Sequence, residues 1–188
     1  MFRQYEINCH ENIFYQLKEQ INFENITKGR IGSTIVNLKN NLIPIVRTTT
    51  KYQNPSQCFT NLHFELIEKI KNILNISQLQ FNNALIEIYT NDYKTMKFHS
   101  DQALDLVNNS YICIYSCYSN SLKHDLRKLI IKNKLSNEIN EVNLFHNSIV
   151  IFSTIDNSNN LHKIILNNNI QFIPKTRKNC TKKCNLIL

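Results

Sequence analysis

Residues 147–166 read NSIVIFSTIDNSNNLHKIIL, and their pattern is the clearest indication of the fold class. Residues 148–154 are apolar and largely β-branched, which is typical of a buried strand. An Asn-rich segment, interpreted as a short turn, separates them from a second predicted strand at 162–166 that begins with His162. Two short strands joined by a turn indicate antiparallel β-structure, and the same pattern can be followed outward along the chain.

Further short strands are predicted after residue 80, each bounded by Asn, Ser or Asp, at 84–89, 96–99, 111–118, 126–131 and 184–188. Before residue 80 the apolar period is helical, and it predicts amphipathic helices over 11–21 and 59–76. Residues 43–52 have the composition of a strand, and the stretch that holds Gly29 and Gly32 predicts a hairpin or loop.

This order predicts an α+β fold in which an antiparallel sandwich or barrel is backed by N-terminal helices. A length of 188 residues fits a single domain, 1–188. We expect a helical and substrate-side extension of about residues 1–80 and a β core of about residues 81–188.

Composition excludes several protein classes. Hydrophobic residues make up 42% of the chain and aromatic residues 10%, so it is not a disordered chain. There is no apolar run of about 18 residues, which excludes a membrane helix and predicts no membrane partner. The N-terminus lacks the apolar stretch of a signal peptide, so we expect an intracellular monomer, in the cytoplasm or nucleus, with six reduced cysteines.

The formal net charge is +8, from 22 Lys and Arg against 14 Asp and Glu. Such a balance favours a polyanionic partner, although a Lys-rich coding bias without any partner explains it as well. The sequence has no Gly-rich phosphate loop, no GxSxG and no HExxH, which argues against nucleotide hydrolases, serine hydrolases and zinc proteases.

The strongest chemical motif is His99-Ser-Asp101. Residues two apart on a strand project to the same side, so both side chains can reach one ion. His162 begins a later strand, and two histidines with one carboxylate on a β scaffold form the facial triad of non-haem Fe(II) oxygenases. His146 is the rival third ligand, ranked lower because it precedes the apolar strand. Arg177 could hold the distal carboxylate of a co-substrate through its two-pronged guanidinium group.

The cysteine pairs Cys113/Cys117 and Cys180/Cys184 are each four residues apart. A zinc site needs four closely spaced ligands, so these pairs are interpreted as packing residues. The basic stretch 123–134 is either a phosphate-binding edge or the solvated face of a hairpin, and both interpretations stay open.

The sequence resembles the AlkB-like branch of the Fe(II)/2-oxoglutarate-dependent dioxygenases. Tyr89 precedes the HxD motif as in that family, and Arg177-Lys-Asn-Cys-Thr181-Lys-Lys183 matches the R-x-N-x-T-x-R strand of its nucleic-acid-repair members except for the final Arg. Residues 44–52, which include Arg47 and Tyr52, resemble the segment that borders the family's substrate site.

The resemblance implies a double-stranded β-helix, or jelly roll, in which His99, Asp101 and His162 bind Fe(II). It implies that Tyr89 and Arg177 bind the distal carboxylate of 2-oxoglutarate, with Lys183 as a further co-substrate contact, and that Arg47 and Tyr52 contact the substrate. With O2, such an enzyme oxidises N-methyl groups of alkylated DNA or RNA, preferably single-stranded, and releases formaldehyde.

Four positions depart from the family pattern: Glu87 replaces an Asn, Lys183 replaces the final Arg, Gln53 replaces a turn Gly and Ala103 replaces an acidic base contact. The departures at Gln53 and Ala103 concern the contacts with the substrate. The same type of oxygenase acting on protein side chains or on a small molecule is therefore the alternative. A third hypothesis is a β-helix that binds nucleic acid without turnover, against which the intact triad speaks.

Overall fold

The structure, a computed structural model, describes residues 2–8, 12–39, 42, 44–76, 78–94, 96–120 and 127–167, together with the backbone of 184–187. Within these residues the chain is mostly β-sheet with few helices. The helices are α1 (Phe14–Glu19), α2 (Asn61–Leu74) and α3 (Thr154–Asn159). The strands are β1 (Arg3–Glu6), β2 (Glu24–Thr27), β3 (Arg30–Val36), β4 (Gln57–Cys58), β5 (Asn83–Thr90), β6 (Tyr111–Tyr118), β7 (Arg127–Asn133), β8 (Ile139–Leu144), β9 (Ser148–Ser153), β10 (Asn160–Leu166) and β11 (Cys184–Ile187).

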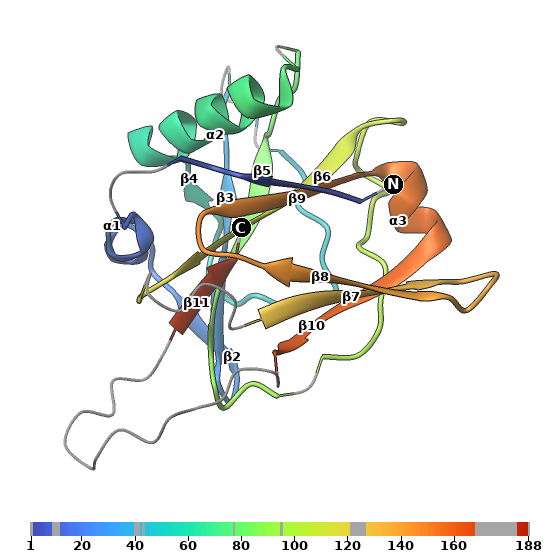
Figure 1. Cartoon of the computed structure of the whole chain (residues 1–188). Helices are drawn as coiled ribbons and strands as arrows, with labels where there is room; N and C mark the ends of the chain where they lie inside the picture. Colours follow the sequence, from blue (N-terminus) through green and yellow to red (C-terminus); the bar gives the residue numbers. More distant parts are fainter. Residues whose placement is uncertain are drawn as a thin grey trace.

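The strands form two sheets (Figure 1). The large sheet has the order β1-β9-β6-β11-β5-β3-β2, with β4 paired to β3, and the small sheet has the order β10-β7-β8. All the strand pairs are antiparallel except β3 with β4. The last strand, β11, lies between β5 and β6, so the end of the chain pairs with strands formed about 70 and 100 residues earlier.

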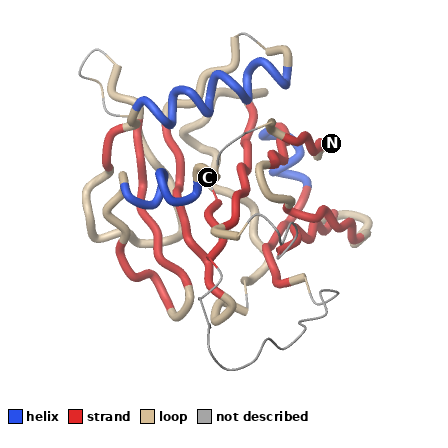
Figure 2. The backbone as a smooth tube through the Cα atoms, turned by 60° about the vertical axis from the view of Figure 1, so that its left-hand side comes forward, coloured by secondary structure: helices blue, strands red, loops and turns tan. Residues whose placement is uncertain are grey.

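The two faces of the large sheet are covered by different layers. On β5, Ile86 and Ile88 belong to the core beneath α1 and α2, whereas Tyr89 belongs to the core between the two sheets. Successive strand residues point to opposite faces, so one strand supplies both cores. Figure 2 shows α1 and the longer α2 against the strands of the large sheet, which leaves its other face for the small sheet and the interior between them.

Both predicted helices are confirmed, with shorter bounds. Phe14 and Leu17 are buried from the first helix, and Leu66 and Ile70 from the second. The predicted hairpin around the glycines is β2–β3, and Gly29 takes φ +77° at its turn. A Cβ at Gly29 would lie 2.4 Å from the backbone nitrogen of Tyr93, so a side chain there would collide with the 90–93 turn.

Several predicted elements are wrong. Residues 44–52 are loop rather than strand, because no strand pairs with them. Residues 96–99 are also not a strand, since only His99 makes an isolated bridge. The Asn-rich turn before His162 contains helix α3, which starts at a capping box in which the Ser153 hydroxyl accepts from the backbone of Asp156.

The N-terminal 80 residues are less helical than expected. They hold α1 and α2 but also β1, β2, β3 and β4, which extend the large sheet at both edges. Strand β8 was not predicted either, because its residues are mostly exposed and lack an apolar alternation. Within the described residues, no helix is long and apolar enough to cross a membrane.

Candidate metal centre

A backbone bridge brings the two predicted histidine ligands together. His99 and His162 form an isolated antiparallel pair, in which the His99 N–H donates to the His162 carbonyl at 3.0 Å and the His162 N–H donates back at 2.7 Å. Directly paired residues carry their side chains on the same face, and the two ring centroids lie 4.6 Å apart. Residues 63 positions apart in the sequence therefore present neighbouring imidazoles.

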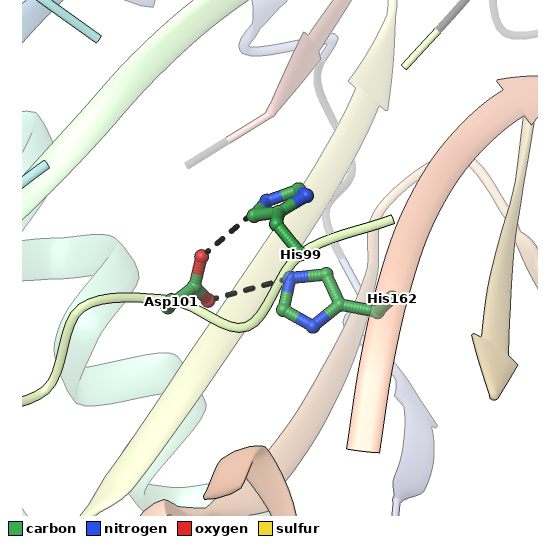
Figure 3. A group of neighbouring side chains, drawn as sticks. All are labelled: His99, Asp101 and His162. Atoms are coloured by element: carbon green, nitrogen blue, oxygen red, sulfur yellow. Dashed lines mark ion pairs between the residues drawn. The ribbon is translucent and has the colours of Figure 1, made fainter. Parts of the chain in front are cut away.

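The carboxylate of Asp101 lies between the two imidazoles (Figure 3). Its Oδ1 is 3.7 Å from Nε2 of His99, and its Oδ2 is 3.5 Å from Nε2 of His162. Asn157 in α3 fixes the backbone at this point: its Oδ1 accepts from the Asp101 N–H and its Nδ2 donates to the Asp101 carbonyl, both at 2.9 Å. The helix that replaces the predicted turn thus positions the carboxylate.

The imidazoles are held with their Nε2 atoms toward Asp101. Nδ1 of His99 lies 3.0 Å from the Lys97 carbonyl, which is the kind of outer contact that fixes the tautomer of a metal-binding histidine. His162 is 4% exposed, its ring lies 5.7 Å from that of Phe152, and its Nδ1 has no hydrogen-bond partner among the described residues. Packing and the contact of its Nε2 with Asp101 hold the second ring in place.

The electrostatics favour an ionised carboxylate. Burial alone would raise the pKa of Asp101, but the hydrogen bond from His162 and the charges of His162 and His99 lower it below the ordinary value. The group is therefore an anion at neutral pH, as a metal ligand must be.

This group fits a divalent metal ion. One donor atom from each of His99, Asp101 and His162 lies within 4.8 Å of the others. Metal–ligand bonds of about 2.0–2.2 Å place neighbouring ligands of one ion about 3 Å apart, so binding would draw the more distant donors together by up to about 2 Å. Three protein ligands leave positions open, and two imidazoles with one carboxylate fit Fe(II) with room for 2-oxoglutarate and O2.

The triad opens onto a cavity of about 1000 Å³. Tyr89, Tyr93 and Ile164 line it on the side of the inter-sheet core, and Ile112 and Ile114 line it from β6. Residues 46–50 and 105–111 also line this cavity, so the loops before α2 and after the triad both contribute to its wall. An apolar cavity with a few convergent polar groups is the usual form of a small-molecule site.

A buried carboxylate, Glu87, lies in the wall of the same cavity and binds three polar groups, from Arg30, Tyr52 and Tyr89. Arg30 forms an ion pair with it and also donates to the Thr50 hydroxyl at 2.9 Å. The Tyr52 hydroxyl donates to its Oε1 at 2.6 Å, and the Tyr89 hydroxyl donates to its Oε2. Burial and the charge of Glu87 raise the pKa of Tyr89 well above its ordinary value, so this phenol stays a hydrogen-bond donor.

A second arginine lies against the same tyrosines from the small sheet. Arg127 is 2% exposed, and its Nη2 donates to the carbonyls of Thr90 at 2.7 Å and Tyr93 at 3.2 Å. Its guanidinium carbon lies 5.1 Å from the ring centroid of Tyr89. The sequence suggested a place for Arg127 at a solvated or phosphate-binding edge, and the structure instead buries it between the sheets.

The structure brings together some of the predicted site residues. His162, and not His146, joins His99 and Asp101; His146 lies at the β8–β9 turn, where its Nδ1 accepts from the Tyr118 N–H at 3.0 Å. Tyr89 and Arg47 both line the cavity, and Tyr52 reaches it through Glu87. Arg177 and Lys183 lie outside the described residues.

Two contributors were missed in the sequence, Asn157 and Arg30. Asn157 lies in a run of asparagines that gives no sign of its contact with Asp101, 56 residues away. Arg30 could have been found from the Glu87 departure, because a buried carboxylate needs a cationic partner. Of the cysteine pairs, Cys117 is buried beneath the helices and Cys113 packs against the same core, as expected for packing residues.

Comparison of the sequence with known proteins finds no match: no protein-family model matches the chain, and no curated protein matches it. Among the solved structures similar to it is the crystal structure of a Pseudomonas putida prolyl-4-hydroxylase, with a TM-score of 0.48 and 11% sequence identity, over 99% of this chain and 90% of that one.

Proposed function

We propose that the chain is an Fe(II)- and 2-oxoglutarate-dependent dioxygenase of the AlkB-like branch, built on a double-stranded β-helix, that oxidatively demethylates bases of single-stranded nucleic acid. The observation that carries the proposal is the convergence of His99, Asp101 and His162 at a cavity of about 1000 Å³. The bridge between His99 and His162 of β10, and the place of β11 between β5 and β6, support the proposed double-stranded β-helix.

The chain's own residues have separate tasks in this reaction. His99, Asp101 and His162 would hold the iron on one side and leave its other side open. Tyr89 would donate to the co-substrate, and its raised pKa keeps the proton on the phenol. Ile112, Ile114 and Ile164 exclude water from the cavity wall. Iron and 2-oxoglutarate, when bound, supply the oxidising chemistry.

The proposal for a nucleic-acid substrate rests on charge and on one loop. The net charge is +8, and the exposed side chain of Arg47 lines the cavity near the triad. A methylated base must leave the stack to reach the iron, which a single strand does at low cost. Two of the basic residues of segment 123–134 are not free for phosphates, since Arg127 is buried and Lys128 is paired with Glu141 at 2.5 Å.

The direct test incubates the protein with Fe(II), 2-oxoglutarate, ascorbate and a panel of methylated oligonucleotides, and follows succinate release and loss of 14 mass units by mass spectrometry. The proposal predicts both, in equal amounts, and neither for His99→Ala. Arg47→Ala should weaken oligonucleotide turnover while the succinate formed without substrate is unchanged. Succinate without any change in the oligonucleotides would refute the demethylase and leave the oxygenase.

A second substrate class is favoured by the loop that follows Asp101. Leu104 is 88% exposed and Val107 is 79% exposed, and Val107 lines the cavity. Exposed apolar side chains beside a cavity favour an apolar contact surface, such as a protein segment, over phosphates. The double variant Leu104→Ser, Val107→Ser separates the classes: a protein substrate would lose turnover, and an oligonucleotide held by phosphate contacts would not.

A further inference from the structure

The cavity at the triad continues beneath helix α2, on the other face of the large sheet. Figure 2 shows α2 lying across the strands of that sheet. The wall of the cavity there is apolar, and we call this part the α2 lobe. It is lined by residues of the helix and of the segments that flank it: Phe59, Leu66, Ile67, Ile70, Leu79 and Phe81. The metal ligand His162, in contrast, packs on Phe152 in the core between the two sheets.

The α2 lobe is connected to the triad through a gap in the large sheet. Residues 111–115 of β6 all line the cavity, although successive strand residues point to opposite faces. A cavity that touches all five therefore runs along the edge of the strand. The strand β11 separates β5 from β6 only along 87–90 and 116–118, and within the described residues no strand lies between 83–86 and 111–115.

One polar side chain, that of His63, lies in this apolar wall. It is 3% exposed and stands one turn before Leu66 and Ile67, on the face of α2 that meets the cavity. Its Nδ1 accepts from the Thr60 N–H at 3.1 Å, so Nε2 carries the proton of the ring. That N–H is buried, and among the described residues nothing accepts from it. Burial lowers the pKa of His63, so the ring is a neutral donor at pH 7.

These features define the chemistry of a ligand. An apolar wall disfavours a charged group, because the group would lose its water without gaining a partner. A neutral N–H donor is satisfied by a neutral acceptor, of which a carbonyl oxygen is the commonest. Protein interiors have few voids larger than a water molecule and rarely leave a buried donor unpaired. An apolar lobe with one placed donor is therefore typical of a binding site.

We infer that the α2 lobe binds the apolar part of a neutral carbonyl compound, whose oxygen accepts from Nε2 of His63. This site goes beyond the proposed function, because binding there needs neither iron nor 2-oxoglutarate. Since the lobe and the triad share one cavity, a ligand long enough to pass the gap in the sheet reaches the metal centre. The competing explanation is structural: His63 only caps α2 through its Nδ1.

The test uses acetophenone and α-methylstyrene, two probes of nearly the same shape that differ in carrying C=O or C=CH2. Their affinities for the protein without added metal or 2-oxoglutarate are measured by calorimetry. The ratio of the two affinities isolates the hydrogen bond, because the apolar contacts are shared. We expect saturable binding of both probes, and a preference for acetophenone that falls about fivefold in His63→Phe, the usual effect of one hydrogen bond. The carbonyl stretch of bound acetophenone should lie at a lower frequency in wild type than in His63→Phe.

Two further comparisons separate the lobe from the helix cap. Thr60→Ala removes the capping side chain of α2 and leaves the Nε2–H of His63, so it should keep the wild-type ratio. Ile67→Phe fills the lobe and should weaken the binding of both probes at least about tenfold. Ile73→Phe is the matched control, because Ile73 lies in the same helix and is not a residue of the cavity wall.

A ratio that is unchanged in His63→Phe, or that falls as far in Thr60→Ala, overturns the role of His63. No binding by wild type, or equal binding by Ile67→Phe and Ile73→Phe, overturns the lobe as the site. If His63→Phe does not fold, the carbonyl frequency in wild type decides: a value equal to that of acetophenone in cyclohexane overturns the hydrogen bond. Since neither metal nor 2-oxoglutarate is present, each of these failures leaves the proposed function untouched.

Discussion

Asn157 is the residue on which the geometry of the metal centre depends most, apart from the ligands themselves. Its carboxamide makes two hydrogen bonds to the backbone of Asp101, and it is 3% exposed. These bonds hold Asp101 against α3 without touching its carboxylate. Nothing in the sequence singles this residue out from its neighbours, because its partner lies 56 residues away.

The first prediction follows for Asn157→Ala. Outer contacts of metal ligands are typically worth ten- to a hundredfold in metal affinity, so the variant should bind Mn(II) or Fe(II) about tenfold more weakly, or worse. Calorimetric titration measures this. Asn159→Ala is the matched control, since Asn159 is an exposed asparagine of the same helix. Equal affinities in the two variants would remove the role of Asn157.

Gly32 is the second residue with a defined spatial role. A Cβ at this position would lie 3.2 Å from Cγ of Glu87 and 3.2 Å from the Tyr52 hydroxyl, both of which belong to the buried cluster. The absent side chain lets Tyr52 reach across β3 to Glu87. Gly32 was noticed in the sequence only as a turn signal, although it lies within β3 and not at the turn.

We therefore predict that the methyl group added in Gly32→Ala crowds the side chains of Glu87 and Tyr52 rather than any backbone atom. Overpacking of this kind costs about 1–3 kcal/mol, which denaturant unfolding will show. Removing the Tyr52 ring at the same time, in Gly32→Ala with Tyr52→Ala, should make the cost of the Gly32 substitution smaller, because two of the three close contacts belong to that side chain. A double variant as unstable as the sum of the two single variants would contradict this explanation.

At the scale of elements, α2 carries a titratable group in its first turn. The Thr60 N–H donates to Nδ1 of His63 at 3.1 Å, so the proton of the ring lies on Nε2, which is buried and has no hydrogen-bond partner in the part of the chain that the structure describes. Burial lowers the pKa of His63. Protonation would place a second proton on the acceptor nitrogen and break the cap.

This arrangement predicts a pH-dependent stability. The unfolded chain, with an ordinary His pKa of about 6.5, binds the proton more readily than the folded one, so the contribution of His63 is complete above pH 6.5 and is lost as the pH falls below it. The loss is at most about 1.4 kcal/mol per pH unit. His63→Gln keeps an acceptor for Thr60, and its free energy of unfolding should fall less between pH 6.5 and 5. Parallel curves for the two proteins would contradict the prediction.

The elements that the sequence predicts well are those with a strong local pattern. The buried strands of YICIYSCY and SIVIFS, and the helix that buries Leu66 and Ile70, are short-range signals. The strand predicted at 44–52 is absent because β-branched residues form a strand only where a partner strand exists. Arg127 was misjudged from its basic neighbours, although its place two residues before Leu129 already put it on the buried face.

At the scale of the whole molecule, the two-sheet arrangement explains why the site lies where it does. The outer face of the large sheet packs against the helices and its inner face packs against the small sheet, and residues of α2, of the large sheet and of β10 all line the cavity. The motif HSD and the later His162 could be paired from the sequence because each is predicted at the end or start of a strand, although His99 makes only an isolated bridge and β10 begins at Asn160. The contacts around the triad could not be predicted, because Arg30 meets Glu87 across the β3–β5 pair and Arg127 reaches the ring of Tyr89 from the other sheet.

The net charge of +8 leads to a prediction for the whole molecule. If the substrate is a single-stranded nucleic acid, its affinity should fall with salt with a log–log slope of about −0.7 for each phosphate contact. Fluorescence anisotropy between 50 and 200 mM salt measures the slope, and Arg47→Ala should reduce it by about one contact. A flat response in the wild type would favour the protein or small-molecule substrate instead.

The central claim is that His99, Asp101 and His162 bind one metal ion, and titration of untagged protein with Mn(II), followed by the electron paramagnetic resonance signal of the free ion, tests it most directly. We expect one ion per chain for the wild type and for His146→Ala, and little or no binding for His162→Ala, because His162, and not His146, lies beside Asp101. Full binding by His162→Ala, or its loss in His146→Ala, would contradict it.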